Sequence, residues 1–271
     1  MVRVLGEKVA APKLYTPEVL EPIDRDGGRR GIDFGNLPAL FGHDVWHLYE
    51  LSWIEAGVGP VSRVGVLTIP ASSPATVESK SLKLYLNSLN FHPFPSSAAA
   101  VACITRDIAA VVGAEVQLTL LEPAEIGGIT REPAGGVIDS GGAAAALGGV
   151  DIRERRELLE AQDLRVEQQL MTHELRSLCP VTGQPDWATL WLHCEGRTLA
   201  PSSLAHYVES FREHQDFHEQ CLERIFSDLW AVLEPTHLTV AAFYTRRGGI
   251  DITPWRSSNE LAPRQDRMGR Q

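Results

Sequence analysis

The sequence predicts an α+β protein built of two similar modules, in each of which an antiparallel sheet is backed by helices. Residues 63–122 run strand, helix, helix, strand, and residues 164–244 repeat that order with one more strand at the start. A segment rich in Gly and Ala, residues 132–150, separates the two. Short stretches match in register, as in LNSLNFH and VESFREH, so we infer an ancient duplication.

The N-terminal module is expected to cover residues 1–135. The run RVGVLTI, residues 63–69, predicts a strand because it is rich in apolar and β-branched side chains. Residues 78–90 and 96–112 have the apolar spacing of helices, and residues 114–122 predict a second strand.

A linker is expected at residues 136–150, where Gly, Ala and turn-forming residues show no lasting period. The C-terminal module then covers residues 151–271. Its predicted elements are two strands, two helices and a strand, at 164–175, 187–195, 203–215, 218–233 and 237–244. In the first helix Leu204, Val208 and Phe211 recur at helical spacing, which gives that helix one apolar face to bury.

The composition points away from extended nucleic-acid binding and from membranes. The chain has 25 basic and 35 acidic residues among 271, a formal charge of -10 that repels polyphosphates. No stretch approaches the roughly 20 apolar residues that cross a bilayer, and the N-terminal sequence lacks the apolar core of a signal peptide. We therefore expect a cytoplasmic protein.

The four cysteines lack the paired spacing of a disulfide framework, so free thiols are expected. Cys103 and Cys221 fall on the apolar stripes of predicted helices, and Cys194 falls in a predicted strand. These three fit the ordinary role of a small buried side chain. Cys179 fits neither pattern and is singled out for that reason.

Cys179 lies in LCPVTGQPDW, residues 178–187, between two predicted strands. Pro180 and Pro185 stiffen this loop, which can present Cys179 and Asp186 together. A preorganised thiol beside a carboxyl group suits a nucleophile. The alternative interpretation is a tight turn with a buried thiol and a capping Asp, and the residues alone leave both open.

Two helix starts carry further candidate residues. His218, between Phe217 and Glu219, begins a predicted helix and could serve as a proton acceptor, or could be a solvated residue at a helix start. The run Glu78-Ser79-Lys80-Ser81 could cap the other helix or contribute to a site.

The turn Arg246-Arg247-Gly248-Gly249 follows a strand and could be plain and solvated, or could seat a phosphate. The sequence has neither a G-x-G-x-x-G fingerprint after a strand nor a Walker A motif. His193 and Cys194 are neighbours in a strand and point to opposite faces, so we expect no metal.

Four motifs resemble one family when taken together: ESKSLKLYLNSLN, CPVTGQPDW, SFREHQDFHE and RRGGIDI. They are similar to the two-module form of the 7-cyano-7-deazaguanine reductases, the QueF family of nitrile reductases from queuosine biosynthesis, a tRNA modification. The resemblance spans both halves, from Glu78 to Ile252. It implies tandem tunnelling-fold modules, whose sheets associate around a central channel, and a homodimer.

The resemblance also implies the chemistry. Cys179 attacks the nitrile to form a thioimide, Asp186 is the proton donor, and NADPH supplies two hydrides that yield 7-aminomethyl-7-deazaguanine. The catalytic residues are then Cys179, Asp186 and His218. The base is bound by Glu78, Ser79, Lys80, Phe217, His218 and Glu219. NADPH is bound by Lys80, Ser81, Arg247 and Gly248.

One position separates this chain from the related GTP cyclohydrolases, which hold zinc through a Cys-x-x-His element. Here Thr182 stands where the His would be, so the resemblance implies no metal. Two other functions stay open: a cysteine-dependent nitrile or amide hydrolase that uses Glu78, Lys80 and Cys179, and a purine-binding module without catalysis. The negative charge argues against direct binding of tRNA.

Overall fold

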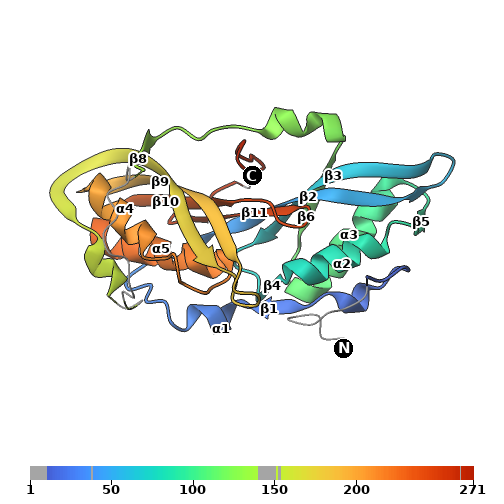
Figure 1. Cartoon of the computed structure of the whole chain (residues 1–271), viewed down its shortest axis with the longest axis horizontal. Helices are drawn as coiled ribbons and strands as arrows, with labels where there is room; N and C mark the ends of the chain where they lie inside the picture. The colour runs from blue at the N-terminus through green and yellow to red at the C-terminus, as the bar shows by residue number, and fades with distance from the viewer. Residues whose placement is uncertain (1–10, 38, 140–150, 152–153, 263) are drawn as a thin grey trace.

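One long sheet organises the molecule (Figure 1). The computed structural model describes residues 11–37, 39–139, 151, 154–262 and 264–271. The strand order in space is β6 (Gln117–Leu121), β3 (Gly59–Pro70), β2 (Phe41–Glu55), β11 (Ile250–Ser257), β10 (His237–Tyr244), β9 (Pro185–Leu199), β8 (Ala161–Leu178) and β7 (Gly136–Val137). The strands pair antiparallel except that β7 pairs parallel with β8 and the short β5 (Pro93–Phe94) pairs parallel with β2. A separate ribbon joins β1 (Pro22–Asp24) to β4 (Ala75–Val77).

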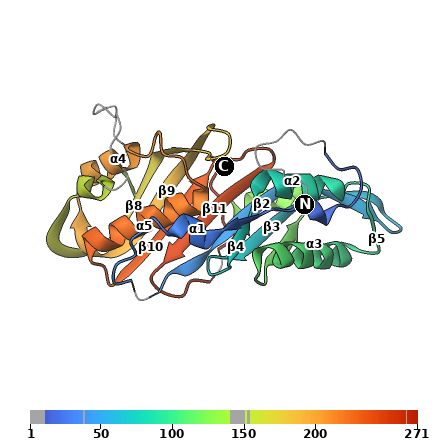
Figure 2. The same cartoon turned by 90° about the horizontal axis from the view of Figure 1, so that it is seen from below.

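The longer helices lie on one side of this sheet (Figure 2). The helices α2 (Ser79–Ser88) and α3 (Ser97–Val112) belong to one end, α4 (Pro201–Glu209) and α5 (His218–Leu233) to the other, and α1 (Arg25–Arg29) contacts α5. Three 3-10 turns are η1 (Pro17–Val19), η2 (Pro123–Ile129) and η3 (Arg155–Leu158). Within the described residues no helix is long and apolar enough to cross a membrane.

The predicted α+β class, with antiparallel strands backed by helices, is confirmed. Each pair of helices packs on its own apolar cluster. The cluster under α2 and α3 includes Trp53, Leu67 and Ile104, and the one under α4 and α5 includes Phe211 and Leu229. The predicted helix at 203–215 is wrong at both ends, because α4 starts at Pro201 and stops at Glu209. Proline suits the first turn of a helix, since its missing N–H has no partner there.

Among the strands of eight residues or more, β2 and β11 were not predicted. The central residues of β2 are buried on both faces and include His43, Asp44 and His47, so the strand shows no apolar alternation. All eight residues of β11 are buried, among them Asp251 and Arg256, and Pro254 obscures the pattern further. Buried charge thus hides the strands in the middle of the sheet.

The predicted linker at 136–150 lies largely outside the described residues, which stop at 139 and resume at 151. Its first two residues form the strand β7, which pairs with β8 at Leu170 and Met171. Asp139 then accepts hydrogen bonds from the Thr172 hydroxyl and the His173 backbone N–H. The division into modules at this segment stays a prediction.

The pairing of β11 with β2 joins the two halves in one sheet. It runs from Ile250 against Leu48 to Ser257 against Phe41. The strands approach so closely that a Cβ on Gly42 would lie 2.0 Å from the Trp255 carbonyl oxygen, and Gly42 has a φ of 140°. Only glycine fits there without strain.

A cluster of buried charges fastens this joint. Arg256 lies 2.8 Å from both Asp44 and Glu223, while Arg25 contacts Asp44 at 2.6 Å and Arg29 contacts Glu223 at 2.7 Å. We call these five residues the junction cluster. Burial would raise the pKa of Asp44, but Arg25 and Arg256 hold it below its usual range. The cluster therefore ties α1 and β2 to α5 and β11.

We expect Asp44→Asn to lower the free energy of unfolding by about 3 to 5 kcal/mol, because it leaves two arginines without their shared charge. Urea unfolding followed by circular dichroism measures the effect. The control is Asp163→Asn, whose carboxylate is 97% exposed in its pair with Arg197 and should matter by no more than about 0.5 kcal/mol. Equal effects of the two substitutions would show that the cluster does not hold the joint.

Candidate active site

A narrow pocket forms where α2 and α5 begin, above the β2–β11 joint. Trp46 of β2 and Ile252 of β11 contribute to its wall. Most of the predicted site residues line it: Glu78, Ser79, Cys179, Asp186, Phe217, His218, Glu219 and Arg247. The two halves of the chain therefore both contribute to one site.

The loop that carries Cys179 is closed by its own backbone. The Cys179 N–H donates to the Gln184 carbonyl at 2.9 Å, and the Gly183 N–H donates to the Cys179 carbonyl at 2.9 Å. Gly183 has a φ of 66°, which glycine adopts at no steric cost. The two prolines thus flank a loop with one defined shape, as the sequence predicts.

Cys179 is only partly buried, and its surroundings favour the thiolate. Burial raises the pKa of the thiol, but hydrogen bonds from the Thr182 hydroxyl and backbone, the Val181 backbone and the Arg247 guanidinium outweigh it, so the pKa is lowered. Thr182 thus stabilises the Cys179 thiolate by hydrogen bonds. The buried thiols differ, because burial raises the pKa of Cys194 to about 11 and of Cys221 to about 12.

Asp186 lies at the start of β9 between two possible partners. Its Oδ2 is 3.2 Å from His218 Nε2, and its Oδ1 is 3.3 Å from an Arg247 guanidinium nitrogen. Asp186 is almost fully buried. The His218 ring is stacked on Tyr244, with centroids 3.7 Å apart and 10° between the planes. The carboxyl and imidazole groups are therefore held within reach of each other and of the pocket.

Two buried glutamates complete the wall. Glu78 caps α2, with its carboxylate accepting from the backbone N–H groups of Lys80 at 2.9 Å and Ser81 at 2.7 Å. Glu219 lies in the first turn of α5, and its pKa is raised by burial and by the nearby charge of Asp44. Both carboxylates keep lone pairs that can accept hydrogen bonds from a ligand.

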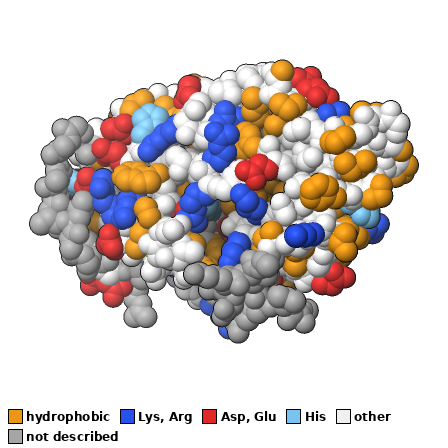
Figure 3. All heavy atoms as spheres, turned by 45° about the vertical axis from the view of Figure 1, so that its right-hand side comes forward, with side chains coloured by type: hydrophobic (Ala, Val, Ile, Leu, Met, Phe, Trp, Pro, Cys, Tyr) orange, Lys and Arg blue, Asp and Glu red, His pale blue; other side chains and the backbone are white. Residues whose placement is uncertain are grey.

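A second pocket, of about 340 Å³, adjoins the first and shares Ser79, His218, Arg247 and Ile252 with it. Its other lining residues include Lys80, Lys83 and Gly248. Figure 3 shows Lys and Arg side chains gathered around the middle of one face of this acidic protein. Cations beside a glycine turn suit the phosphates of a dinucleotide.

The structure separates some residues that the sequence groups together. Lys80 lines the second pocket but not the first. Ser81 lines neither, because its buried hydroxyl donates to the Glu78 carbonyl and accepts from the Glu21 N–H. Arg247, expected at the cofactor alone, also contacts Asp186.

Sequence reasoning missed Lys83 and Trp46. Lys83 follows Lys80 by three residues and therefore shares its helix face, a signal that could have been used. It donates to the Gly248 carbonyl at 2.6 Å and pairs with Glu50 at 3.2 Å. Trp46 belongs to the unpredicted strand β2, so nothing marked it.

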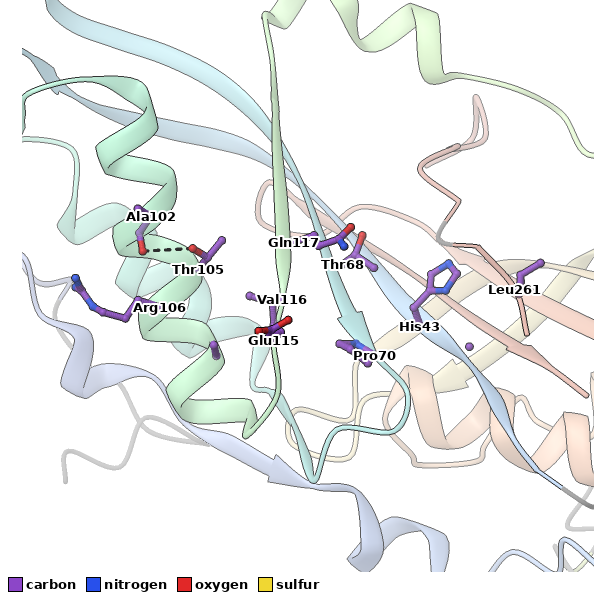
Figure 4. Close-up of a pocket in the computed structure, with 12 residues that line it drawn as sticks. His43, Thr68, Pro70, Ala102, Thr105, Arg106, Glu115, Val116, Gln117 and Leu261 are labelled. Carbon is purple, nitrogen blue, oxygen red and sulfur yellow. Dashed lines mark hydrogen bonds between the residues drawn. The ribbon is translucent and has the colours of Figure 1, made fainter. Parts of the chain in front are cut away.

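A wider hollow of about 620 Å³ lies elsewhere, between α3, the starts of β2 and β6 and the end of β3, with Leu261 from beyond the end of β11 (Figure 4). It contains Thr105 and Arg106 of α3 and His43, but none of the predicted site residues. Burial lowers the pKa of His43 to about 4, and its Nε2 accepts from the Arg264 backbone N–H. None of its described lining residues is a cysteine, so the thiol chemistry is assigned to the Cys179 pocket.

No group of three or more His, Cys, Asp or Glu side chains that could hold a metal occurs among the described residues. Cys194 is fully buried in the apolar cluster of the C-terminal helices. Its neighbour His193 instead contacts Glu167 at 3.0 Å.

Comparison with known proteins gives consistent matches. Residues 12–120 match the family model described as "Nitrile reductase, 7-cyano-7-deazaguanine-reductase N-term", and residues 185–263 match "QueF-like protein". Proteins named NADPH-dependent 7-cyano-7-deazaguanine reductase are similar over nearly the whole chain. The one from Teredinibacter turnerae is 45% identical and aligns over 96% of this chain and 92% of its own length. That from Bordetella pertussis is 44% identical, over 97% and 95% respectively.

Among solved structures, a crystal structure of the archaeosine synthase QueF-Like in the apo form aligns with 38% of this chain and all of its own. The identity is 17% and the TM-score is 0.31.

We expect iodoacetamide to modify Cys179 first, at a pH below that at which an ordinary thiol reacts. A lowered pKa means that the reactive thiolate forms earlier as the pH rises, whereas Cys194 and Cys221 stay protonated. Mass spectrometry of peptides over a pH series measures this. Thr182→Val, which keeps the shape and removes the hydroxyl donor, should move the midpoint for Cys179 to higher pH. An unmoved midpoint would show that Thr182 does not stabilise the thiolate.

Proposed function

The chain belongs to the family of NADPH-dependent 7-cyano-7-deazaguanine reductases, and on this premise we propose that Cys179 carries the nitrile chemistry as a covalent thioimide. It is an NADPH-dependent oxidoreductase that converts the nitrile of 7-cyano-7-deazaguanine to an amine. The observation that carries the residue assignment is the pocket itself. Cys179, Asp186 and His218 meet there with the two glutamates, and a cationic pocket adjoins them.

The first step is addition of the Cys179 S–H across the carbon–nitrogen triple bond. The thiol proton passes to Asp186, whose Oδ2 lies 3.2 Å from His218 Nε2, and the sulfur forms its bond to the nitrile carbon. One electron pair of the triple bond moves to nitrogen, which takes the proton from Asp186. The thioimide forms with no net gain or loss of protons. A thiol of lowered pKa makes the first transfer easier.

The base is held by acceptors on two sides. Glu78 and Glu219 offer carboxylate oxygens to the N–H groups of a guanine-like edge, and Phe217 lines the same pocket and can pack on the ring face. Ser79 completes the wall beside Glu78. An analogue that lacks those N–H groups would leave buried carboxylates without partners, which explains selectivity.

The second pocket fits the cofactor. Lys80, Lys83 and Arg247 would hold its phosphates, and Gly248, with a φ of 59°, forms the turn beside them. When bound there, NADPH would supply the two hydrides that reduction of a nitrile to an amine requires. Ser81 takes an indirect part, because its buried hydroxyl supports the Glu78 backbone at the start of α2.

The alternative functions gain no support from the geometry. A hydrolase that uses Glu78, Lys80 and Cys179 needs the three together, but Lys80 lines the neighbouring pocket. A binding module has no use for a thiol whose pKa is lowered. The homodimer, the cytoplasmic location, the module boundaries and the absence of direct tRNA binding remain predictions.

We expect wild-type protein mixed with the nitrile base alone to gain the mass of one base, and to consume two NADPH per base when the cofactor is added. Intact-mass spectrometry and absorbance at the NADPH band measure the two. Cys179→Ala should give neither adduct nor oxidation of NADPH, since the sulfur is the attacking atom. An adduct on the alanine variant would assign the nucleophile to another residue. Release of ammonia without loss of NADPH would instead indicate a hydrolase.

We expect Arg247→Ala and Lys80→Ala to differ. Both should raise the Michaelis constant for NADPH, Arg247→Ala by about 10- to 150-fold, because a charge-assisted hydrogen bond is lost. Only Arg247→Ala should also slow adduct formation in the absence of NADPH, because this arginine contacts Asp186 and the Cys179 sulfur. Stopped-flow mixing with the base measures that rate. If Arg247→Ala forms the adduct at the wild-type rate, this arginine takes part in cofactor binding only.

A further inference from the structure

Trp46 lines the Cys179 pocket and carries a buried hydrogen-bond donor that nothing in the described chain accepts. The residue lies in β2, paired with Ile252 on one side and Leu67 on the other. Its side chain is 1% exposed, and the indole Nε1–H has no partner among the described residues. Trp46 and Ile252 both contribute to the pocket wall.

An unpaired donor in this position needs an explanation. Native proteins satisfy nearly all buried polar groups, because a buried N–H without an acceptor loses its hydrogen bond to water. The indole N–H can only donate, so neither a lone pair nor a change of protonation can relieve it. A ligand that brings an acceptor into the pocket would supply the missing partner.

The other polar groups of the pocket show which ligand atom that would be. Its carboxyl groups, those of Glu78, Glu219, Asp186 and Asp216, come from four places in the chain, and ionised carboxylates can only accept. They suit the N–H groups of a guanine-like base. The same base has a carbonyl oxygen next to its ring N–H, and carboxylates repel it. A neutral donor is the group that this oxygen requires.

We propose that the Trp46 indole N–H donates a hydrogen bond to the carbonyl oxygen of the base and thereby selects an oxo over an amino substituent. The proposal rests on the proposed function, since it takes the Cys179 pocket as the base site. An amino group at that position would place N–H against N–H, and neither side could accept. Trp46 is therefore a specificity-determining residue of the pocket.

The test compares Trp46→Phe with wild type on two nitriles. One is 7-cyano-7-deazaguanine, and the other is its analogue with an amino group in place of the carbonyl oxygen. For the oxo base we expect Trp46→Phe to weaken binding, measured as the concentration that half-saturates adduct formation, by about 5- to 150-fold. For the amino analogue the substitution should not weaken binding, because no bond is lost and the contact between two donors is removed.

Trp255→Phe is the matched control. Trp255 is also 1% exposed with an unpartnered indole N–H, within the described residues, but it packs in a separate cluster with Trp191 and Phe243 and does not line the pocket. It should leave the preference for the oxo base unchanged. If both variants lose the same affinity for both nitriles, Trp46 acts through packing and the proposal fails.

A spectroscopic signature checks the bond directly. The indole ¹H–¹⁵N resonance that disappears in Trp46→Phe should shift downfield in wild-type protein when the base binds, and its proton should exchange more slowly with water. An unshifted resonance in the saturated complex would overturn the proposal while leaving the thioimide chemistry intact. Failure of wild-type protein to form any adduct would instead overturn the proposed function.

Discussion

The site depends on one joint, the pairing of β2 with β11, and on the junction cluster that fastens it. Arg256 reaches from β11 to Asp44 of β2 and to Glu223 of α5, so one fully buried guanidinium sets the distance between two halves of the chain. Each partner is satisfied by a second arginine, which makes the burial of these charges tolerable. Glu223 lies one helical turn beyond Glu219, so the same contact that joins the halves also positions the first turn of α5 beside the pocket.

That placement brings two helix starts to one pocket. The partial positive charge at the N-terminal ends of α2 and α5 favours anions, and the pocket uses this for carboxylates and for a thiolate. The Glu78 carboxylate accepts two backbone hydrogen bonds at the start of α2, and these hold the side chain in position for a ligand. The pKa of Glu219, by contrast, is raised, because this carboxyl group is buried close to the negative charge of Asp44. The two glutamates are thus alike in chemistry but different in environment.

The longer helices could be predicted from the sequence because each has one apolar face, and the strands β3, β6, β8, β9 and β10 because their runs are rich in apolar and β-branched residues. The strands β2 and β11 could not, since residues such as Asp44, Asp251 and Arg256 are buried where apolar residues are expected. Most of the residues that line the Cys179 pocket and were proposed for the site were picked out by their motifs, and the stiff loop at Cys179 was visible in its prolines. The sequence could not show that Arg247 lines both pockets, because this depends on how the turn after β10 packs against the loop before β9. Trp46 was not identified because its strand, β2, was not predicted.

The joint also has a consequence for synthesis on the ribosome. β2 lies near the beginning of the chain and its partner β11 near the end, so β2 leaves the ribosome long before that partner exists. Until then one edge of β2 has unpaired backbone groups, and the aspartate that Arg256 will neutralise is already present. An open strand edge can pair with other chains. The charged side chains of this strand, which stay hydrated until the last strand arrives, disfavour pairing of the unfinished edge with other chains.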